Sequence, residues 1–143
     1  MLAKRIARKL LGESDYEPIG KIGDYDLGVS TDGKFKRYDL HRGGPSGINV
    51  AYLTTKPDLR GNGVAFDGLY VSPDYRGKGL GKALLQKGLE LHPKQDIFLR
   101  ARPYKDKSVS TDSLVNLYQS VGFKKLIPDN KMDVKYPVLK YSA

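Results

Sequence analysis

Short apolar runs separated by turn residues occupy the chain from about residue 25 to residue 71. The runs have the length and composition of strands, and the segments between them, such as STDGK and KPDLRGNG, are rich in turn-forming residues. Connections this short favour antiparallel pairing of successive strands. The pattern therefore predicts a meander of four strands, Tyr25–Val29, Phe35–His41, Ile48–Thr54 and Ala65–Val71.

After residue 79 the apolar positions change to the spacing of a helix that ends at His92-Pro93. The residues expected on its inner face are Leu80, Ala83, Leu84, Gly88 and Leu91. A second helix is expected at Ser110–Ser120, with Ser110 or Thr111 as its cap and Gly122 at its end. The remaining predicted strands are Asp96–Arg102, Phe123–Leu126 and Val134–Tyr141.

These elements predict an α/β fold, in which a mixed, mostly antiparallel and twisted sheet is flanked by helices. Residues 2–11 carry apolar side chains on one stripe and basic ones opposite, which predicts a short basic amphipathic helix within residues 1–12. This helix either docks on the body with a solvated charged face or contacts a membrane surface or nucleic acid. Because the sequence shows no repeat and no linker, we expect residues 1–143 to form a single domain.

The composition of the 143 residues narrows the class of protein further. A hydrophobic content of 39% with 29% charged residues is typical of a globular chain. No apolar stretch is long enough for a membrane span, and the N-terminus lacks the pattern of a secretory signal. The absence of cysteine excludes disulfides, thiolate metal ligands and a thiol nucleophile. We therefore expect a cytoplasmic protein.

The net charge of +9 is unevenly distributed along the chain. Residues 1–62 hold 11 basic against 8 acidic residues, whereas residues 63–143 hold 14 against 8. A basic excess favours a polyanionic partner, such as a nucleotide, a nucleic acid or an acidic surface.

The glycine-rich turn at residues 76–82, RGKGLGK, lies in the more basic part and begins the first predicted helix of the core. It is not a P-loop, because Arg76 replaces the first glycine and Ala83 replaces the Ser or Thr that binds magnesium. It is not a dinucleotide fingerprint either, because Lys82 replaces the last glycine.

A strand followed by glycines at the start of a helix is nevertheless suited to bind an anion. Glycines let the backbone approach a ligand closely, and the free N–H groups of a helix N-terminus favour negative charge. Arg76, Lys78 and Lys82 add positive charge at the same place. We interpret the turn as a phosphate or pyrophosphate site, with a purely structural glycine turn as the alternative.

Two segments carry a family resemblance. The pattern V-x-P-x-Y-R-G-K-G-L-G-x-x-L-L resembles the acyl-CoA-binding motif of the GCN5-related N-acetyltransferase (GNAT) superfamily, whose core Arg/Gln-x-x-Gly-x-Gly/Ala is matched by Arg76, Gly79 and Gly81. Downstream, LVNLYQSVGF resembles the family's L-Y-x-x-x-G-F segment, in which Tyr118 is in register. The resemblance covers residues 63–126, the expected acyl-CoA-binding core.

The resemblance implies that backbone amides of the turn hold the pyrophosphate of coenzyme A and that the preceding strand pairs with pantetheine. Thr111 stands where the family often has an asparagine that contacts the cofactor. The cofactor-binding residues implied in this way are Leu69, Tyr70, Val71, Arg76, Gly77, Lys78, Gly79, Leu80, Gly81, Lys82 and Thr111.

Two residues are expected to carry the chemistry. By resemblance Tyr118 protonates the departing thiolate, for which a phenol is chemically suited. The alternative is a buried aromatic residue of the helix core, and the register with Gly122 and Phe123 favours the acid. Asp67 precedes Val71 by four residues on a predicted strand, so we expect both side chains on the same face. Its carboxylate either accepts the amine proton or orients the substrate, or else forms only an ion pair. The thioester carbonyl would be polarised by a backbone N–H near Val71.

The N-terminal half departs from the family, which usually begins with a strand and two helices that wall the acceptor site. This chain offers one basic helix and then strands, so the acceptor side is abbreviated or built differently. Arg100 and Arg102 alternate with Leu99 and Ala101, and they either line an acceptor cleft, bind an acidic group or are simply solvated.

The expected function is transfer of an acetyl group from acetyl-CoA to a primary amine of a small molecule or a protein, without a metal. The sheet should splay between Ala65–Val71 and Asp96–Arg102 to admit pantetheine. One alternative is an acyl-CoA-binding module on the same fold without transfer chemistry. Another is a nucleic-acid-binding or protein-binding module, prompted by the charge. The chain could be a monomer or a homodimer.

Overall fold

The computed structural model describes residues 15–43, 47–58, 63–102, 110–126 and 138–142. The helix predicted within residues 1–12 and the predicted strand residues 134–137 lie outside this part of the chain. The strands are β1 (Asp15–Ile22), β2 (Tyr25–Asp32), β3 (Phe35–Arg42), β4 (Ile48–Pro57), β5 (Val64–Val71), β6 (Ile97–Arg100), β7 (Lys124–Lys125) and β8 (Val138–Tyr141). The helices are the 3-10 turn η1 (Pro73–Tyr75), α2 (Leu80–Leu91) and α3 (Thr111–Val121).

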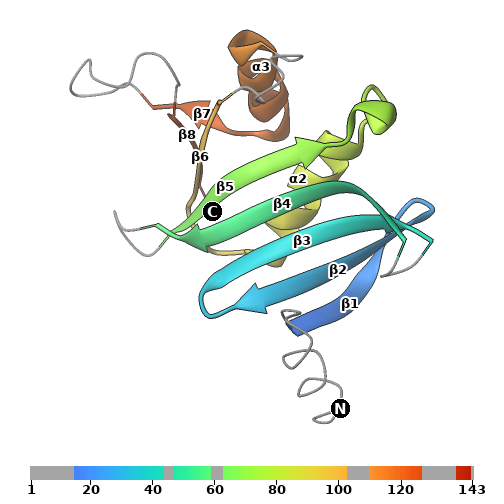
Figure 1. Cartoon of the computed structure of the whole chain (residues 1–143). Coiled ribbons are helices and arrows are strands. Elements are labelled where there is room, and N and C mark those ends of the chain that lie inside the picture. The colour runs from blue at the N-terminus through green and yellow to red at the C-terminus, as the bar shows by residue number, and fades with distance from the viewer. Residues whose placement is uncertain (1–14, 44–46, 59–62, 103–109, 127–137, 143) are drawn as a thin grey trace.

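The described strands form one sheet in the order β1-β2-β3-β4-β5-β6-β8-β7. Every neighbouring pair is antiparallel except β5 and β6, which run parallel because α2 crosses between them. Figure 1 shows the meander of β1 to β5 as one broad twisted surface. The predicted mixed, mostly antiparallel sheet is therefore confirmed.

Two-residue turns connect the first three strands. Gly23 and Gly33, with φ of 58° and 60°, open the turns after β1 and β2, where a short hairpin connection requires a positive φ. In the described part of residues 15–71 no helix interrupts the meander. The sequence left open whether this half is abbreviated or built differently, and residues 1–14 lie outside the described part of the chain.

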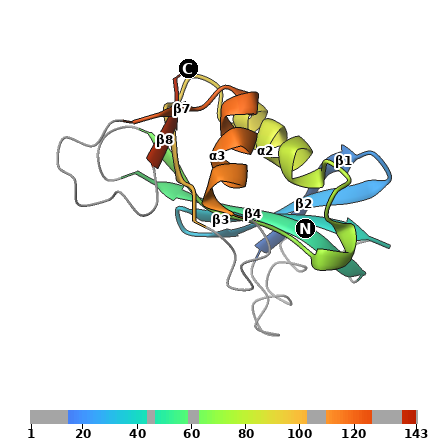
Figure 2. The ribbon, with the colours of Figure 1, turned by 90° about the horizontal axis from the view of Figure 1, so that it is seen from above.

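Both α2 and α3 lie on the same face of the sheet, which we call the helix face (Figure 2). The core residues come from the inner side of the sheet and from the facing stripes of the two helices. Gly88 allows α2 to approach closely, because a Cβ there would lie 2.7 Å from Leu53 Cδ2. Leu80, Leu84 and Leu85 are buried, but Leu91 is 39% exposed, so its predicted place on the inner face is wrong.

Strand β1 was not predicted from the sequence. It pairs with β2 from Asp15 to Ile22, with a register shift between Pro18 and Gly20. Proline and glycine weaken the strand signal and are tolerated on an edge strand. In the described part of the chain, no helix is long and apolar enough to cross a membrane.

Candidate functional site

The parallel strands β5 and β6 separate after three residue pairs. Val64, Ala65 and Phe66 pair with Ile97, Phe98 and Leu99, and the register stops there. From Gly68 to Val71, β5 is paired with β4 on one side only. The expected splay of the sheet is confirmed, and it exposes one backbone edge of β5 where another strand would normally lie.

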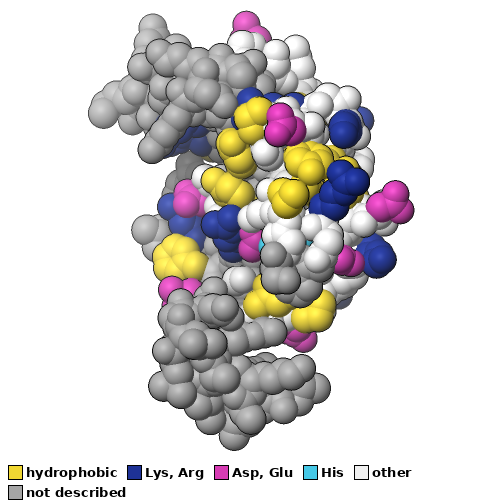
Figure 3. Space-filling model, turned by 45° about the vertical axis from the view of Figure 1, so that its right-hand side comes forward, with side chains coloured by type: hydrophobic (Ala, Val, Ile, Leu, Met, Phe, Trp, Pro, Cys, Tyr) yellow, Lys and Arg dark blue, Asp and Glu magenta, His cyan; other side chains and the backbone are white. Residues whose placement is uncertain are grey.

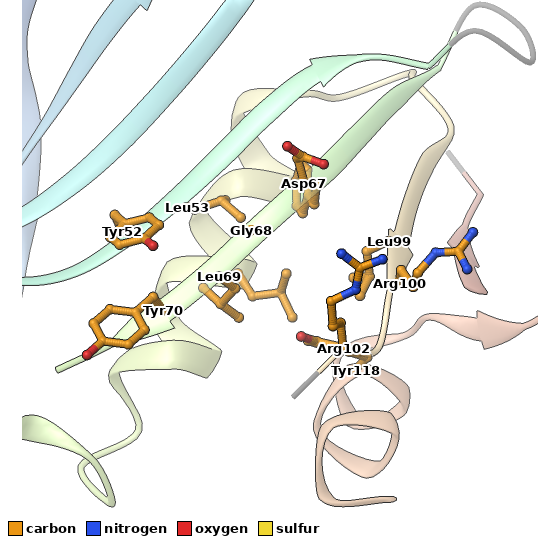
Figure 4. A pocket seen from close by; sticks show the side chains of 12 residues that line it. Tyr52, Leu53, Asp67, Gly68, Leu69, Tyr70, Leu99, Arg100, Arg102 and Tyr118 are labelled. Carbon is orange, nitrogen blue, oxygen red and sulfur yellow. The ribbon is translucent and has the colours of Figure 1, made fainter. Parts of the chain in front are cut away.

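A cavity of about 510 Å³ occupies the splay (Figure 4). Its floor is apolar and comes from the helix face, with Leu53, Phe66, Leu69, Leu85 and Leu99. Its other lining residues are Tyr52, Asp67, Gly68, Tyr70, Arg100, Arg102 and Tyr118. An apolar floor with a few converging polar groups is typical of a ligand site.

The glycine-rich turn forms the N-terminus of α2, beside the end of β5. Gly77 and Gly79 have φ of 80° and 77°, which explains why glycine stands at these positions. Gly79 is the N-cap and provides no side-chain cap. The first intrahelical bond runs from Ala83 N to Gly79 O at 3.0 Å, so the N–H groups of Leu80–Lys82 precede the helical ladder.

The two helix N-termini differ in how their amides are satisfied. At α3 the Ser110 side chain is the cap and accepts a hydrogen bond from Ser113 N at 3.1 Å, which confirms one of the two predicted caps. At α2 no acidic residue lies in the first turn. The α2 terminus can therefore receive an external anion, and Lys78 and Lys82 are exposed beside it.

Arg76 anchors the turn to β5. Its Nε donates a hydrogen bond to Val71 O at 2.8 Å, and its guanidinium carbon lies 5.5 Å from the centre of the Tyr70 ring. We expected this residue to add charge to the phosphate site, but the structure gives it a positioning contact. The Val71 carbonyl is thereby already engaged.

Asp67 lies at a β-bulge in β5. Phe66 pairs with Thr55 and Gly68 with Thr54, so Asp67 is the extra residue. Beyond the bulge, Leu69 pairs with Leu53 and Val71 with Ala51. Leu69 and Val71 therefore point to the same face of the sheet as Phe66, which precedes the bulge. Asp67 and Val71 therefore point to opposite faces, and the prediction that they share a face is wrong. Alternation by two does not hold across an inserted residue.

The Asp67 carboxylate forms an ion pair with Lys56 Nζ at 3.2 Å, and its side chain is 55% exposed. Asp67 also lines two further hollows beside the first, one of about 680 Å³ and one of about 440 Å³. The structure thus shows the ion pair that was one of the two alternatives. It also places the carboxylate at the mouth of the cavity, where the other alternative requires it.

Tyr118 projects from α3 into the same cavity and is only 4% exposed. Its ring packs against Phe123, with 6.3 Å between the ring centres. Gly122, with φ of 118°, ends α3 as predicted. Thr111 is the first residue of this helix and is not among the residues that line the 510 Å³ cavity.

Arg100 and Arg102 alternate with buried residues as predicted. Leu99 and Ala101 are buried, whereas the two arginines are more exposed and line the cavity. They extend from the end of β6 on the side of the sheet opposite the helices, which we call the open face. Figure 4 shows the Arg102 guanidinium in the space between β5 and β6, whereas the Arg100 side chain extends from β6 on the side away from β5.

An aromatic pair at the cavity mouth was not predicted as a unit. Tyr52 and Tyr70 stack with 5.4 Å between ring centres, and Arg37 lies 4.3 Å from the centre of the Tyr52 ring. The two tyrosines are direct partners across β4 and β5. Cross-strand pairing could have indicated the pair, but only once the register was known.

His92 ends α2 and connects it to the sheet. Its Nε2 lies 3.1 Å from Tyr38 Oη, and its Nδ1 lies 3.1 Å from Gln95 Oε1. Burial lowers the pKa of His92, the Gln95 hydrogen bond opposes this change, and the charge of Lys36 adds to it. Burial also raises the pKa of Tyr38. In the described residues no group of three or more His, Asp or Glu could hold a metal ion.

The basic side chains do not form one continuous field on the face drawn in Figure 3. Among the residues that the figure colours, Lys and Arg are interspersed with hydrophobic and acidic side chains. This distribution gives no particular support to nucleic-acid binding.

The sequence of residues 60–125 matches the family profile described as an acetyltransferase (GNAT) domain. The segment contains the turn, the splayed strands and Tyr118. Over this segment the chain resembles a GNAT domain. The resemblance inferred from the two motifs is thereby confirmed. No curated protein matches the sequence.

Solved GNAT structures share the fold at low sequence identity. A histone acetyltransferase HPA2 and related acetyltransferase from Corynebacterium glutamicum has a TM-score of 0.57 at 20% identity, over 77% of this chain and 65% of its own. A spermidine N-acetyltransferase chimera from Vibrio cholerae and hSSAT has a TM-score of 0.55 at 15% identity, over 78% of this chain and 68% of its own.

The Bacillus subtilis N-acetyltransferase YlbP, solved in complex with coenzyme A, has a TM-score of 0.53 at 20% identity. That match covers 75% of this chain and 67% of the other. The chain thus spans about two thirds of the length of these structures. At such identities the likeness shows the fold.

Proposed function

We propose that this GNAT-like domain transfers an acetyl group from acetyl-CoA to a primary amine. The observation that supports the proposal most strongly is the splay of β5 and β6. It opens an apolar-floored cavity that has the uncapped N-terminus of α2 near one end and Tyr118 in its wall. A long, thin thioester with an anionic head fits such a site.

Acetyl-CoA would be held mainly by backbone groups. The N–H groups of Leu80–Lys82 and the glycine turn would bind its pyrophosphate, with Lys78 and Lys82 adding charge. The open edge of β5 at Leu69–Val71 would pair with pantetheine, apart from the Val71 carbonyl, which Arg76 occupies. Thr111 would contribute at most from the margin, since it does not line the cavity.

The transfer forms a bond between the amine nitrogen and the acetyl carbon and breaks the carbon–sulfur bond. Asp67 would orient the amine or take its proton, directly or through water. A backbone N–H near Val71 would stabilise the negative charge on the carbonyl oxygen. The Tyr118 hydroxyl would give its proton to the departing thiolate. Each step uses a residue that lines the cavity or lies next to one that does.

Release of free thiol from acetyl-CoA in the presence of pooled primary amines tests the function. Tyr118→Phe is expected to slow transfer by about 100-fold, the usual size of an acid–base contribution. Tyr25→Phe is the matched control, since it removes the same atom from a tyrosine of β2 outside the cavity lining. Equal rates in the Tyr118→Phe variant and the parent would contradict the role of this tyrosine.

Thermal unfolding with coenzyme A and acetyl-CoA separates transfer from binding. At a concentration of 100 times Kd, a ligand stabilises the native state by about 2.7 kcal/mol. Stabilisation without any thiol release would favour the binding module over the enzyme. Absence of stabilisation by any CoA thioester would refute both.

A further inference from the structure

Arg100 and Arg102 bring two positive charges into the cavity from the same strand. They are two residues apart at the end of β6, and both line the 510 Å³ and 680 Å³ hollows. Leu99 and Ala101, which alternate with the two arginines along the chain, are buried. Alternation therefore places both arginine side chains on the open face. Both residues thus border the same hollows, and in Figure 4 the Arg102 guanidinium lies between β5 and β6 while that of Arg100 lies on the other side of β6.

The charge of the cavity lining does not match an acetyl group and a simple amine. Asp67 is the one acidic residue among the described residues that line the 510 Å³ cavity, and Lys56 already pairs with it. An acetyl group is neutral, and an amine must be neutral when it attacks. Neither partner requires two arginines, so the lining indicates a substrate with a negative group.

The phosphates of coenzyme A do not explain these arginines. The register places Leu99 beside Phe66, so Arg100 lies level with Asp67. Val71, to which the start of the glycine turn is bonded through Arg76, lies four residues further along β5, or roughly 13 Å at the rise of a strand. The arginines therefore lie near the reacting end of the cavity and away from the pyrophosphate end.

We propose that Arg100 and Arg102 bind a carboxylate carried by one of the two substrates. The inference rests on the proposed acyl transfer. A guanidinium has five N–H donors in a planar fork that matches a carboxylate, so each arginine can bind one while keeping the contact that it makes within the chain. The side chains of Tyr52 and Tyr70 stack beside this place.

The carboxylate could belong to the acceptor, as in an α-amino acid, or to the acyl group, as in a dicarboxylic acyl-CoA. The open face favours the acceptor, because the apolar floor that suits the thioester comes from the helix face. With its amine near Asp67 and its carboxylate at the arginines, a small zwitterion would bridge the splay between β5 and β6.

Matched substrate pairs distinguish the two sources. The acceptor arm uses acetyl-CoA with two pairs of amines, phenylalanine compared with phenethylamine and lysine compared with cadaverine. The two members of each pair differ only in one carboxylate. The acyl arm uses succinyl-CoA against butyryl-CoA with a fixed amine. We expect kcat/KM to favour the carboxylate-bearing member in one arm by 10-fold or more, the size of one charge-assisted contact.

We expect the ratio of the two kcat/KM values to fall toward 1 in Arg100→Gln and in Arg102→Gln. The kcat/KM of the substrate without the carboxylate should change little in either variant. Arg102→Lys, which keeps the charge but loses the fork, should retain part of the preference. Arg42→Gln is the control, since it removes an exposed arginine at the end of β3 that lines none of the three hollows. Stabilisation of each variant by coenzyme A checks that it folds.

Three results would overturn the inference. They are no carboxylate preference in either arm, a preference that survives both glutamine variants, and an equal loss with every acyl-CoA and every amine. The last result would indicate a contact with coenzyme A itself. If no thioester binds or reacts at all, the proposed function fails first, and the carboxylate site fails with it.

Discussion

Side chains in this site have two kinds of task, and Arg76 illustrates the difference. It lies in the segment expected to bind phosphate, yet its Nε bonds to the Val71 carbonyl. The contact joins the start of the turn to the end of β5, so it fixes where the α2 amides lie relative to the strand. Asp67 and Tyr118, in contrast, line the cavity.

Replacing Arg76 with glutamine tests the positioning role. Loss of the bond to Val71 should let the turn move and should weaken acetyl-CoA binding by about 10-fold, since a hydrogen bond from a charged donor is worth that much. Lys78→Gln removes a nearby exposed charge without this bond, and its effect should be smaller and should vanish at high salt. Isothermal titration at two salt concentrations makes the comparison.

The same loss of affinity in both variants, with the same salt dependence, would mean that Arg76 acts only through its charge. A lowered kcat with unchanged affinity would also contradict the positioning role.

At the scale of elements, the contact between α2 and the sheet determines where the proposed anion site lies. Gly88 is buried against Leu53 and Phe66, and Gly81 faces Val71, so the helix lies close to β4 and β5 along its length. The first turn of α2 is thereby held beside the splay. Packing in the middle of the helix and the proposed binding at its end are therefore physically connected.

Gly88→Ala should therefore destabilise the protein although alanine is the better helix former. A Cβ at this position would lie 2.7 Å from Leu53 Cδ2 and 3.0 Å from the Phe66 ring. Overpacking of this kind typically costs about 1–3 kcal/mol, against a gain of about 1 kcal/mol from helix propensity. Urea unfolding gives the difference, and Gln86→Ala on the exposed side of α2 is the control.

An unchanged or raised free energy of unfolding for Gly88→Ala would show that the helix can shift away from the sheet at no cost. In that case the affinity for acetyl-CoA should fall instead, because the α2 amides would move with it.

Much of the site was accessible from the sequence because it depends on local signals. The glycines at 77 and 79 need a positive φ, and Ser110 with Gly122 marks the ends of α3. The rest depends on pairing partners. The bulge at Asp67 appears only when β5 is set against β4, and β1 carries Pro18 and Gly20, which argue against a strand. The ion pair to Lys56 joins two strands whose register no local pattern specifies.

At the scale of the whole molecule, one layer of helices covers one face of a sheet, and polar contacts join the two layers as well as apolar packing. The pair of Tyr38 and His92 is one of them, since it connects β3 to the end of α2. Its protonation state therefore bears on the docking of the helix.

The free energy of unfolding should fall as the pH drops below about 6.5. Burial holds the pKa of His92 below 6.5 in the native state, so below that pH the unfolded chain binds more protons than the folded one. His92→Gln removes this contribution. Thermal unfolding is measured between pH 7.5 and pH 5, and the stability of each protein is expressed relative to its own value at pH 7.5. The loss of stability toward pH 5 should be smaller for the variant than for the parent.

An identical pH dependence in parent and variant would assign the effect to other groups. A loss of stability toward high pH in this interval would have the wrong sign for a histidine whose neutral form is favoured.

The candidate catalytic carboxylate, Asp67, is the extra residue of the β5 bulge. Asp67 has no partner of its own in the ladder with β4, and its neighbours Phe66 and Gly68 pair with consecutive residues of that strand. A shortened strand that lacks this residue should fold around the same interior and still accommodate a thioester. In evolution, therefore, such a scaffold could gain or lose its carboxylate in a single event, and catalysts and inert binders could descend from one another without any rebuilding of the interior.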